Sequence, residues 1–144
     1  MFLDAIRYAK SKGFHRLHVS ANGIRFAESR NFAVEASAAG LHGLYLQFDG
    51  VSEEKNKHRG LGNYMEVKLR ALENIAAAGM QTILQVTVVN GLNNDCVGEM
   101  VRFALRNADQ IHGVIFQPVM FTGRDERIST DDLQAQTSIR LEVV

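Results

Sequence analysis

Cysteine and proline are nearly absent from this sequence, and it has no long hydrophobic run. A single cysteine, Cys96, cannot form an internal disulfide and is typical of a chain kept in a reducing compartment. No run approaches the roughly 18 apolar residues of a membrane-spanning helix. The N-terminus also lacks the basic-then-apolar pattern of a signal peptide. These absences predict a cytoplasmic protein without a membrane partner.

An excess of charge of either sign is missing as well. The 144 residues include 16 basic and 16 acidic side chains, so the formal net charge is +0. A neutral chain does not favour nucleic acid or an anionic membrane as a partner. The length suits one domain, and a hydrophobic content of 46% is enough for a real core.

The stretch that organises the sequence is the apolar run 43–48, which ends at Asp49-Gly50. Its leucine and phenylalanine side chains recur at every second residue, as in a β-strand. The run is typical of a strand that is covered on both faces. In α/β proteins, ligand-binding groups lie where parallel strands end, and Gln47 and Asp49 fall at that point.

The same plan recurs along the chain at intervals of roughly 30 residues, with a glycine closing most helices. The pattern predicts strands at 16–20, 43–48, 82–89 and 113–117, and helices at 2–12, 26–39, 64–78 and 95–107. Such βα repeats indicate a parallel sheet, whose strands all end at one edge. A flavodoxin-like sheet would share this edge rule. The polar loop 50–62 is the longest internal connection, and long loops are often functional.

Several short motifs resemble segments of the radical S-adenosylmethionine enzymes. The runs 20–23, 46–50 and 58–60 are similar to the family's Thr-Asn-Gly, Ser-x-Asp-Gly and Arg-Gly segments, and 90–95 and 116–120 resemble its later strand ends. These five motifs occur in the family's order within residues 2–124. The chain most resembles the branch related to molybdenum-cofactor biosynthesis protein A, near the tetraether-lipid synthase and pterin-methylating relatives.

The resemblance implies a fold, two cofactors and a set of site residues. The fold is an α/β, TIM-barrel-like but incomplete (β/α) barrel, with strands three to six of the family barrel in residues 1–124 and a polar tail at 125–144. Full-length members use S-adenosylmethionine and a [4Fe–4S] cluster. The resemblance assigns cofactor binding to Ser20, Asn22, Gln47, Asp49, Gln85 and Met120. Turn formation is the alternative for Ser20, Asn22 and Asp49, a solvent-facing side chain is the alternative for Gln47, and core packing is the alternative for Met120.

The family's Cys-x-x-x-Cys-x-x-Cys segment does not occur in this sequence. An iron–sulfur cluster of this kind needs three thiolates, and Cys96 supplies one. We therefore expect no metal ligands or catalytic residues here. The prediction is a fragment of a radical enzyme that is inactive alone and retains neither cofactor.

The alternative hypothesis is a non-catalytic βα binding domain that associates with itself. An incomplete barrel leaves unpaired edge strands, at 16–20 and 113–117, and such edges seek partners. A homo-oligomer is expected on this hypothesis.

Overall fold

Four parallel strands form one sheet in the computed structural model, which describes residues 1–60 and 62–120. Their order in the sheet is their order in the chain: β1 (Leu17–Ala21), β2 (Leu41–Gln47), β3 (Gln81–Val88) and β4 (Gly113–Pro118). All three pairings are parallel. This architecture confirms the predicted α/β fold with four parallel strands and flanking helices. The predicted tail at 125–144 lies outside the described residues.

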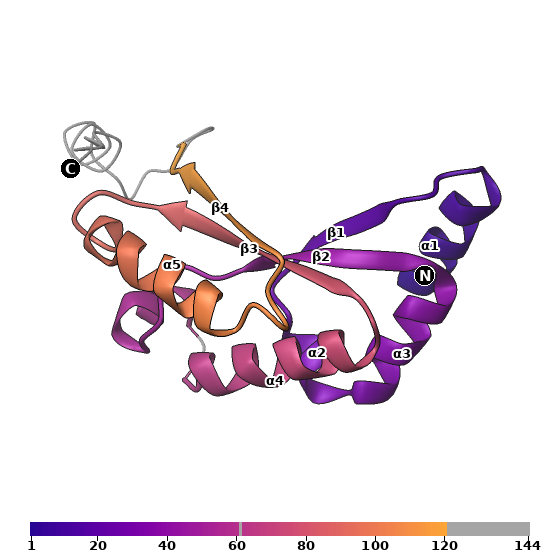
Figure 1. Cartoon of the computed structure of the whole chain (residues 1–144), viewed down its shortest axis with the longest axis horizontal. Coiled ribbons are helices and arrows are strands. Elements are labelled where there is room, and N and C mark those ends of the chain that lie inside the picture. The colour runs from indigo at the N-terminus through magenta and orange to yellow at the C-terminus, as the bar shows by residue number, and fades with distance from the viewer. Residues whose placement is uncertain (61, 121–144) are drawn as a thin grey trace.

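Helices connect the strands and cover one side of the sheet (Figure 1). They are α1 (Phe2–Ser11), α2 (Ile24–Glu28), α3 (Arg30–Ala39), α4 (Tyr64–Ala77) and α5 (Val97–Arg106). The strand side chains that face them form the core, including Leu44, Leu46, Leu84 and Val86, all 0% exposed. The alternate positions of each strand face the opposite side, as the pleat requires. That opposite face corresponds to the interior of a barrel.

The helix predicted at 26–39 is two helices, which corrects the sequence-based expectation. Ser29 separates α2 from α3 because its backbone is extended, with φ −142° and ψ 107°. Its hydroxyl accepts a hydrogen bond from the Phe32 amide at 3.1 Å, which caps the start of α3. The break lets Phe26 and Phe32 meet edge to face, with ring centroids 5.0 Å apart.

The loop predicted at 50–62 contains a short 3-10 helix, η1 (Glu54–Arg59). Lys55 fastens this helix to the segment after β3. Its ammonium donates to the Leu92 carbonyl at 2.8 Å and to both carboxylate oxygens of Asp95, at 2.7 and 2.8 Å. The loop is therefore held beside the strand ends by a charge-assisted contact.

This contact predicts a pH dependence for the docking of η1. Hydrogen bonding to Asp95 raises the pKa of the Lys55 ammonium, and the same bond lowers the pKa of the Asp95 carboxyl. The Asp95 contribution is present above the carboxyl's unfolded pKa and is lost as pH falls through the lowered folded value. The Lys55 contribution is present below the ammonium's unfolded pKa and is lost as pH rises through the raised folded value. We expect the docking to loosen in acid below the ordinary aspartate pKa of about 3.9 and in base above the ordinary lysine pKa of about 10.4.

An NMR titration of the amide signals of 52–56 measures this loosening. The acid transition should vanish in Asp95→Asn and persist in Asp109→Asn, a matched change in the α5–β4 connection. An acid transition that survives in Asp95→Asn would count against the role of this carboxylate.

No helix in the two described ranges is long and apolar enough to cross a membrane.

Candidate functional site

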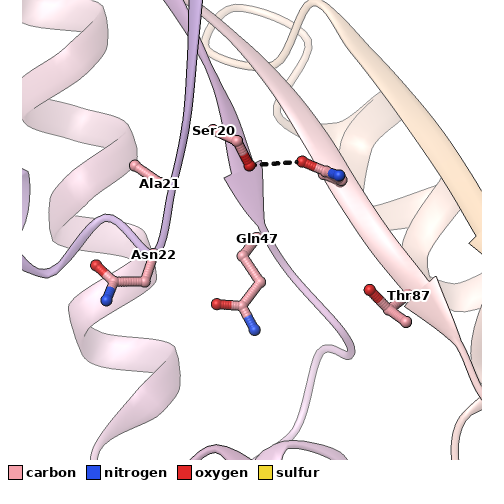
Figure 2. Close-up of a pocket in the computed structure, with 6 residues that line it drawn as sticks. Ser20, Ala21, Asn22, Gln47 and Thr87 are labelled. Carbon is pink, nitrogen blue, oxygen red and sulfur yellow. Dashed lines mark hydrogen bonds between the residues drawn. The ribbon is translucent and has the colours of Figure 1, made fainter. Parts of the chain in front are cut away.

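A polar cavity of about 290 Å³ opens where the first three strands end. It is lined by Ser20, Ala21, Asn22, Gln47, Gln85 and Thr87. Figure 2 shows the side chains of Ser20, Asn22, Gln47 and Thr87 gathered around this space from three neighbouring segments. None of the six carries a formal charge, and five bear hydroxyl or amide groups. The cavity therefore offers hydrogen-bond donors and acceptors to a polar ligand.

Gln85 is the centre of a row of hydrogen bonds on the face of the sheet opposite the helices. Its Oε1 accepts from the Ser20 hydroxyl at 2.9 Å, the bond drawn as a dashed line in Figure 2. Its Nε2 donates to Oε1 of Gln117 on β4 at 3.2 Å. Gln85 thus links the two edge strands, with Gln47 as its register partner on β2.

Gln47 and Asp49 take different places, although both follow β2. Gln47 is half-buried and lines the cavity. Asp49 is 0% exposed, and its carboxylate accepts from the Thr87 amide at 3.0 Å and from Nε2 of Gln47 at 3.2 Å. Asp49 therefore ties the ends of β2 and β3 together, and it is not among the lining residues. These side-chain contacts join two strands rather than form a local turn, and the predicted contact of Asp49 with a cofactor stays a prediction.

Asn22 forms a turn and also lines the cavity, while its predicted contact with a cofactor stays a prediction. Its Oδ1 accepts from the Ile24 amide at 3.1 Å, an Asx turn that ends β1, while the side chain also lines the cavity. Gly23 follows at φ +84°, and a Cβ there would lie 2.6 Å from Cδ1 of Leu46. A side chain at position 23 would therefore clash with Leu46, so the turn requires glycine there.

Met120 lies apart from the other predicted residues. Its side chain is 79% exposed, and it does not line this cavity. Its predicted contact with a cofactor stays a prediction. Thr87, in contrast, lines the cavity and was not predicted. It lies two residues beyond Gln85 on the same strand, so the two-residue period of β3 would have found it.

Asn93 is, like Asp49, a buried polar residue that joins the ends of β2 and β3. Its Nδ2 donates to the carbonyls of Asp49 and Thr87, both at 2.8 Å, and its Oδ1 accepts from the Val89 amide at 2.7 Å. The sequence placed Asn93 in a turn but gave no sign that its side chain would be buried. Its bonds keep the strand ends in register beneath the cavity.

The residues present do not fit an iron–sulfur cluster. Cys96 is 4% exposed, and its thiol donates to the Asn93 carbonyl at 3.1 Å. Burial raises the pKa of this thiol, and the neighbouring Asp95 raises it further, whereas cluster ligands are thiolates. Within 1–60 and 62–120, no group of three histidine, cysteine or acidic side chains is placed to hold a metal ion.

Comparison with known proteins gives one family match and two curated relatives. Residues 1–104 match the model of the Radical SAM superfamily. The chain is 36% identical, over 126 residues and 86% of its length, to a 7,8-dihydro-6-hydroxymethylpterin dimethyltransferase of Methanocaldococcus jannaschii. It is 27% identical, over 132 residues and 91% of its length, to an Fe-coproporphyrin III synthase of Methanosarcina barkeri. The aligned parts are 25% and 31% of these relatives, so the chain spans about a quarter to a third of their length.

Proposed function

Because this chain belongs to the radical SAM superfamily, we propose that it supplies one wall of an S-adenosylmethionine site at the ends of β1, β2 and β3. The observation that carries the proposal is the uncharged polar cavity at that edge, since ligands of parallel α/β sheets bind beyond the carboxyl ends of the strands. Hydroxyl and amide groups suit a ribose diol and the edge of a purine, because both offer donors and acceptors side by side.

Each proposed contact follows from the position of a side chain in the cavity. Ser20 and Gln85 present a hydroxyl and an amide that already orient one another at 2.9 Å. Gln47 and Asn22 border the same space from the ends of β2 and β1. Asp49 acts indirectly by holding the Gln47 side chain and the Thr87 amide near the end of β3. Bound S-adenosylmethionine would supply a sulfonium centre for group transfer or radical chemistry.

We propose further that these 144 residues do not perform that chemistry alone. The sequence has one cysteine, and its buried thiol does not suit cluster binding. The thiolates of a [4Fe–4S] cluster would have to come from other residues. A wall of three strand ends also encloses only part of a ligand, so we expect weak, reversible binding that is lost during purification rather than a retained cofactor.

The relatives suggest a branch and a class of reaction. The 36% identity to a pterin dimethyltransferase supports a placement near the pterin-methylating relatives. The molybdenum-cofactor-related branch and a cytoplasmic location are further parts of the proposal. A methylation of a pterin-like heterocycle by the whole protein is the reaction that we propose on this basis.

Replacing Gln85 tests the cavity as the cofactor site. Gln85→Leu removes the amide that joins Ser20 and Gln117, so the Kd for S-adenosylhomocysteine should rise about tenfold, the cost of roughly one hydrogen bond and the unpaired group it leaves. Equilibrium dialysis measures this change. Gln81→Leu, an exposed change at the opposite end of β3, is the matched control. Equal affinities in Gln85→Leu and Gln81→Leu would contradict the assignment.

A second candidate function is a self-associating binding domain. Its support is the sheet itself, in which, over residues 1–60 and 62–120, β1 and β4 each pair with one neighbouring strand. Edge strands of this kind can pair with another copy, and Ile115 on β4 is 43% exposed. Sedimentation velocity of the isolated chain should then detect a dimer or larger oligomer. A monomer at working concentration would eliminate this candidate and leave the cofactor proposal intact.

A further inference from the structure

Lys68 lies inside the protein, directly behind the strand ends that border the cavity. It is 1% exposed, whereas every other lysine and arginine whose burial is described, within 1–56, 60 and 62–120, is at least partly exposed. An ammonium group inside a protein is unfavourable unless it is paired and hydrogen-bonded. The contacts of the Lys68 ammonium must therefore compensate for its burial.

Those contacts reach the end of β1. The Lys68 ammonium donates to the backbone carbonyl of Asn22, and it also lies 4.7 Å from the centroid of the Tyr64 ring. Asn22 lines the cavity directly after β1, and within the described residues β1 pairs with β2 alone. The lysine thus adds a fixed contact to a strand end that, in this part of the chain, is paired on one side.

Tyr64 lies one helical turn before Lys68 and reaches the end of β2. Its hydroxyl donates to the Gln47 carbonyl at 3.3 Å and accepts from the Asp49 amide at 3.3 Å. Two side chains on the same face of α4 therefore contact two of the three backbone segments that border the cavity, the ends of β1 and β2. This pair ties those two segments to one rigid helix.

We propose that Lys68 is a positioning residue for the ligand in the strand-end cavity, an inference that rests on the function proposed above. By holding the Asn22 carbonyl, it fixes the peptide that carries the Asn22 side chain into the cavity. A lysine serves this purpose because its stem is long enough to cross from α4 to β1 and its ammonium is a strong donor. The lysine does not touch the ligand, so its effect on affinity passes through Asn22.

Two variants of α4 separate this role from a general effect on stability. Lys68→Met keeps the stem and removes the ammonium. Leu72→Met changes a side chain on the same helix that is also 1% exposed but packs against Leu46, Phe48 and Leu84. The amide hydrogen-exchange rate of the ligand-free protein should rise about tenfold at 20–24 in Lys68→Met, because the end of β1 loses one charge-assisted bond. The rate at 20–24 should be unchanged in Leu72→Met.

Ligand affinity gives the second readout. The Kd for S-adenosylhomocysteine, followed by NMR titration, should rise about tenfold in Lys68→Met and less than about twofold in Leu72→Met at matched temperature below unfolding. Tyr64→Phe should loosen 47–49 and leave 20–24 unchanged. Should Lys68→Met fail to fold, the wild-type protein still reports on the contact, because a bonded, buried ammonium gives a slowly exchanging lysine signal with a nuclear Overhauser effect to the Tyr64 ring.

The outcomes separate the two proposals. Unchanged exchange at 20–24 in folded Lys68→Met, or the lack of a protected lysine ammonium in the wild type, would overturn the role of Lys68. A wild-type chain that binds no S-adenosylhomocysteine at millimolar concentration, while exchange at 20–24 still rises in Lys68→Met, would overturn the cofactor site and reduce Lys68 to a residue that stabilises the turn.

Discussion

Replacing Asn93 by leucine is expected to lower the free energy of unfolding by about 4 kcal/mol, because three backbone groups lose their partner. Asn93 is 0% exposed; its bond to the Asp49 carbonyl is buried, and its bonds to the Thr87 carbonyl and the Val89 amide are partly buried. The carbonyls of Asp49 and Thr87 lose their donor, and the Val89 amide loses its acceptor. Each buried polar group left unpaired costs about 1–3 kcal/mol. Urea unfolding followed by circular dichroism measures the change.

The adjacent asparagine provides the control. Asn94 is exposed, and its side chain bonds locally to Gly91 and Asn90. Asn94→Leu should therefore cost less than about 1 kcal/mol, as is usual for surface positions. A loss for Asn93→Leu that is no larger than for Asn94→Leu would show that the strand ends are not held by this amide.

Replacing Phe48 by alanine should cost about 3–5 kcal/mol, the range measured for large aromatic-to-alanine changes in protein cores. Phe48 is 0% exposed and stacks on Phe103 at a centroid distance of 5.1 Å. Its amide donates to the Gln85 carbonyl at 2.9 Å, which holds the backbone in place and keeps the core from closing over the lost ring. A cavity would remain beneath the strand ends.

Two substitutions bracket this prediction. Phe48→Leu retains most of the volume and should cost about 1–2 kcal/mol. Phe14→Ala removes a ring that is 62% exposed and should change stability by less than about 0.5 kcal/mol. Thermal or urea unfolding in which Phe48→Ala resembles Phe14→Ala would contradict the assignment of Phe48 to the core.

The sheet could be predicted from the sequence because its signal is local. The alternating apolar residues of 43–48 and the β-branched run at 82–89 mark strands, and the helices between them require parallel pairing. The break at Ser29 was missed because Phe26, Phe32 and Ala33 keep a plausible helical spacing across it. The side-chain cap on Phe32 decides the break, and that bond depends on an extended backbone at Ser29.

The cavity could be predicted in part, for a geometric reason. Parallel strands end at one edge, so Ser20, Asn22, Gln47 and Gln85 had to lie near one another. The direction of each side chain was harder to predict. Asp49 turns inward because the Thr87 amide faces it, a contact between residues 38 apart in sequence. Lys68 is harder still, because a lysine on a helix normally extends into water, and its burial follows from the tertiary packing of α4 rather than from local sequence.

The cofactor site at the ends of the first three strands is the central claim, and one NMR experiment tests it most directly. Titration of the isotope-labelled chain with S-adenosylmethionine should shift the amide signals of 20–23, 47–49 and 85–87 in a saturable way. Signals at the starts of the strands, such as 41–43 and 81–83, should not move. Saturable shifts confined to the strand starts, or no shifts up to millimolar ligand, would contradict the account.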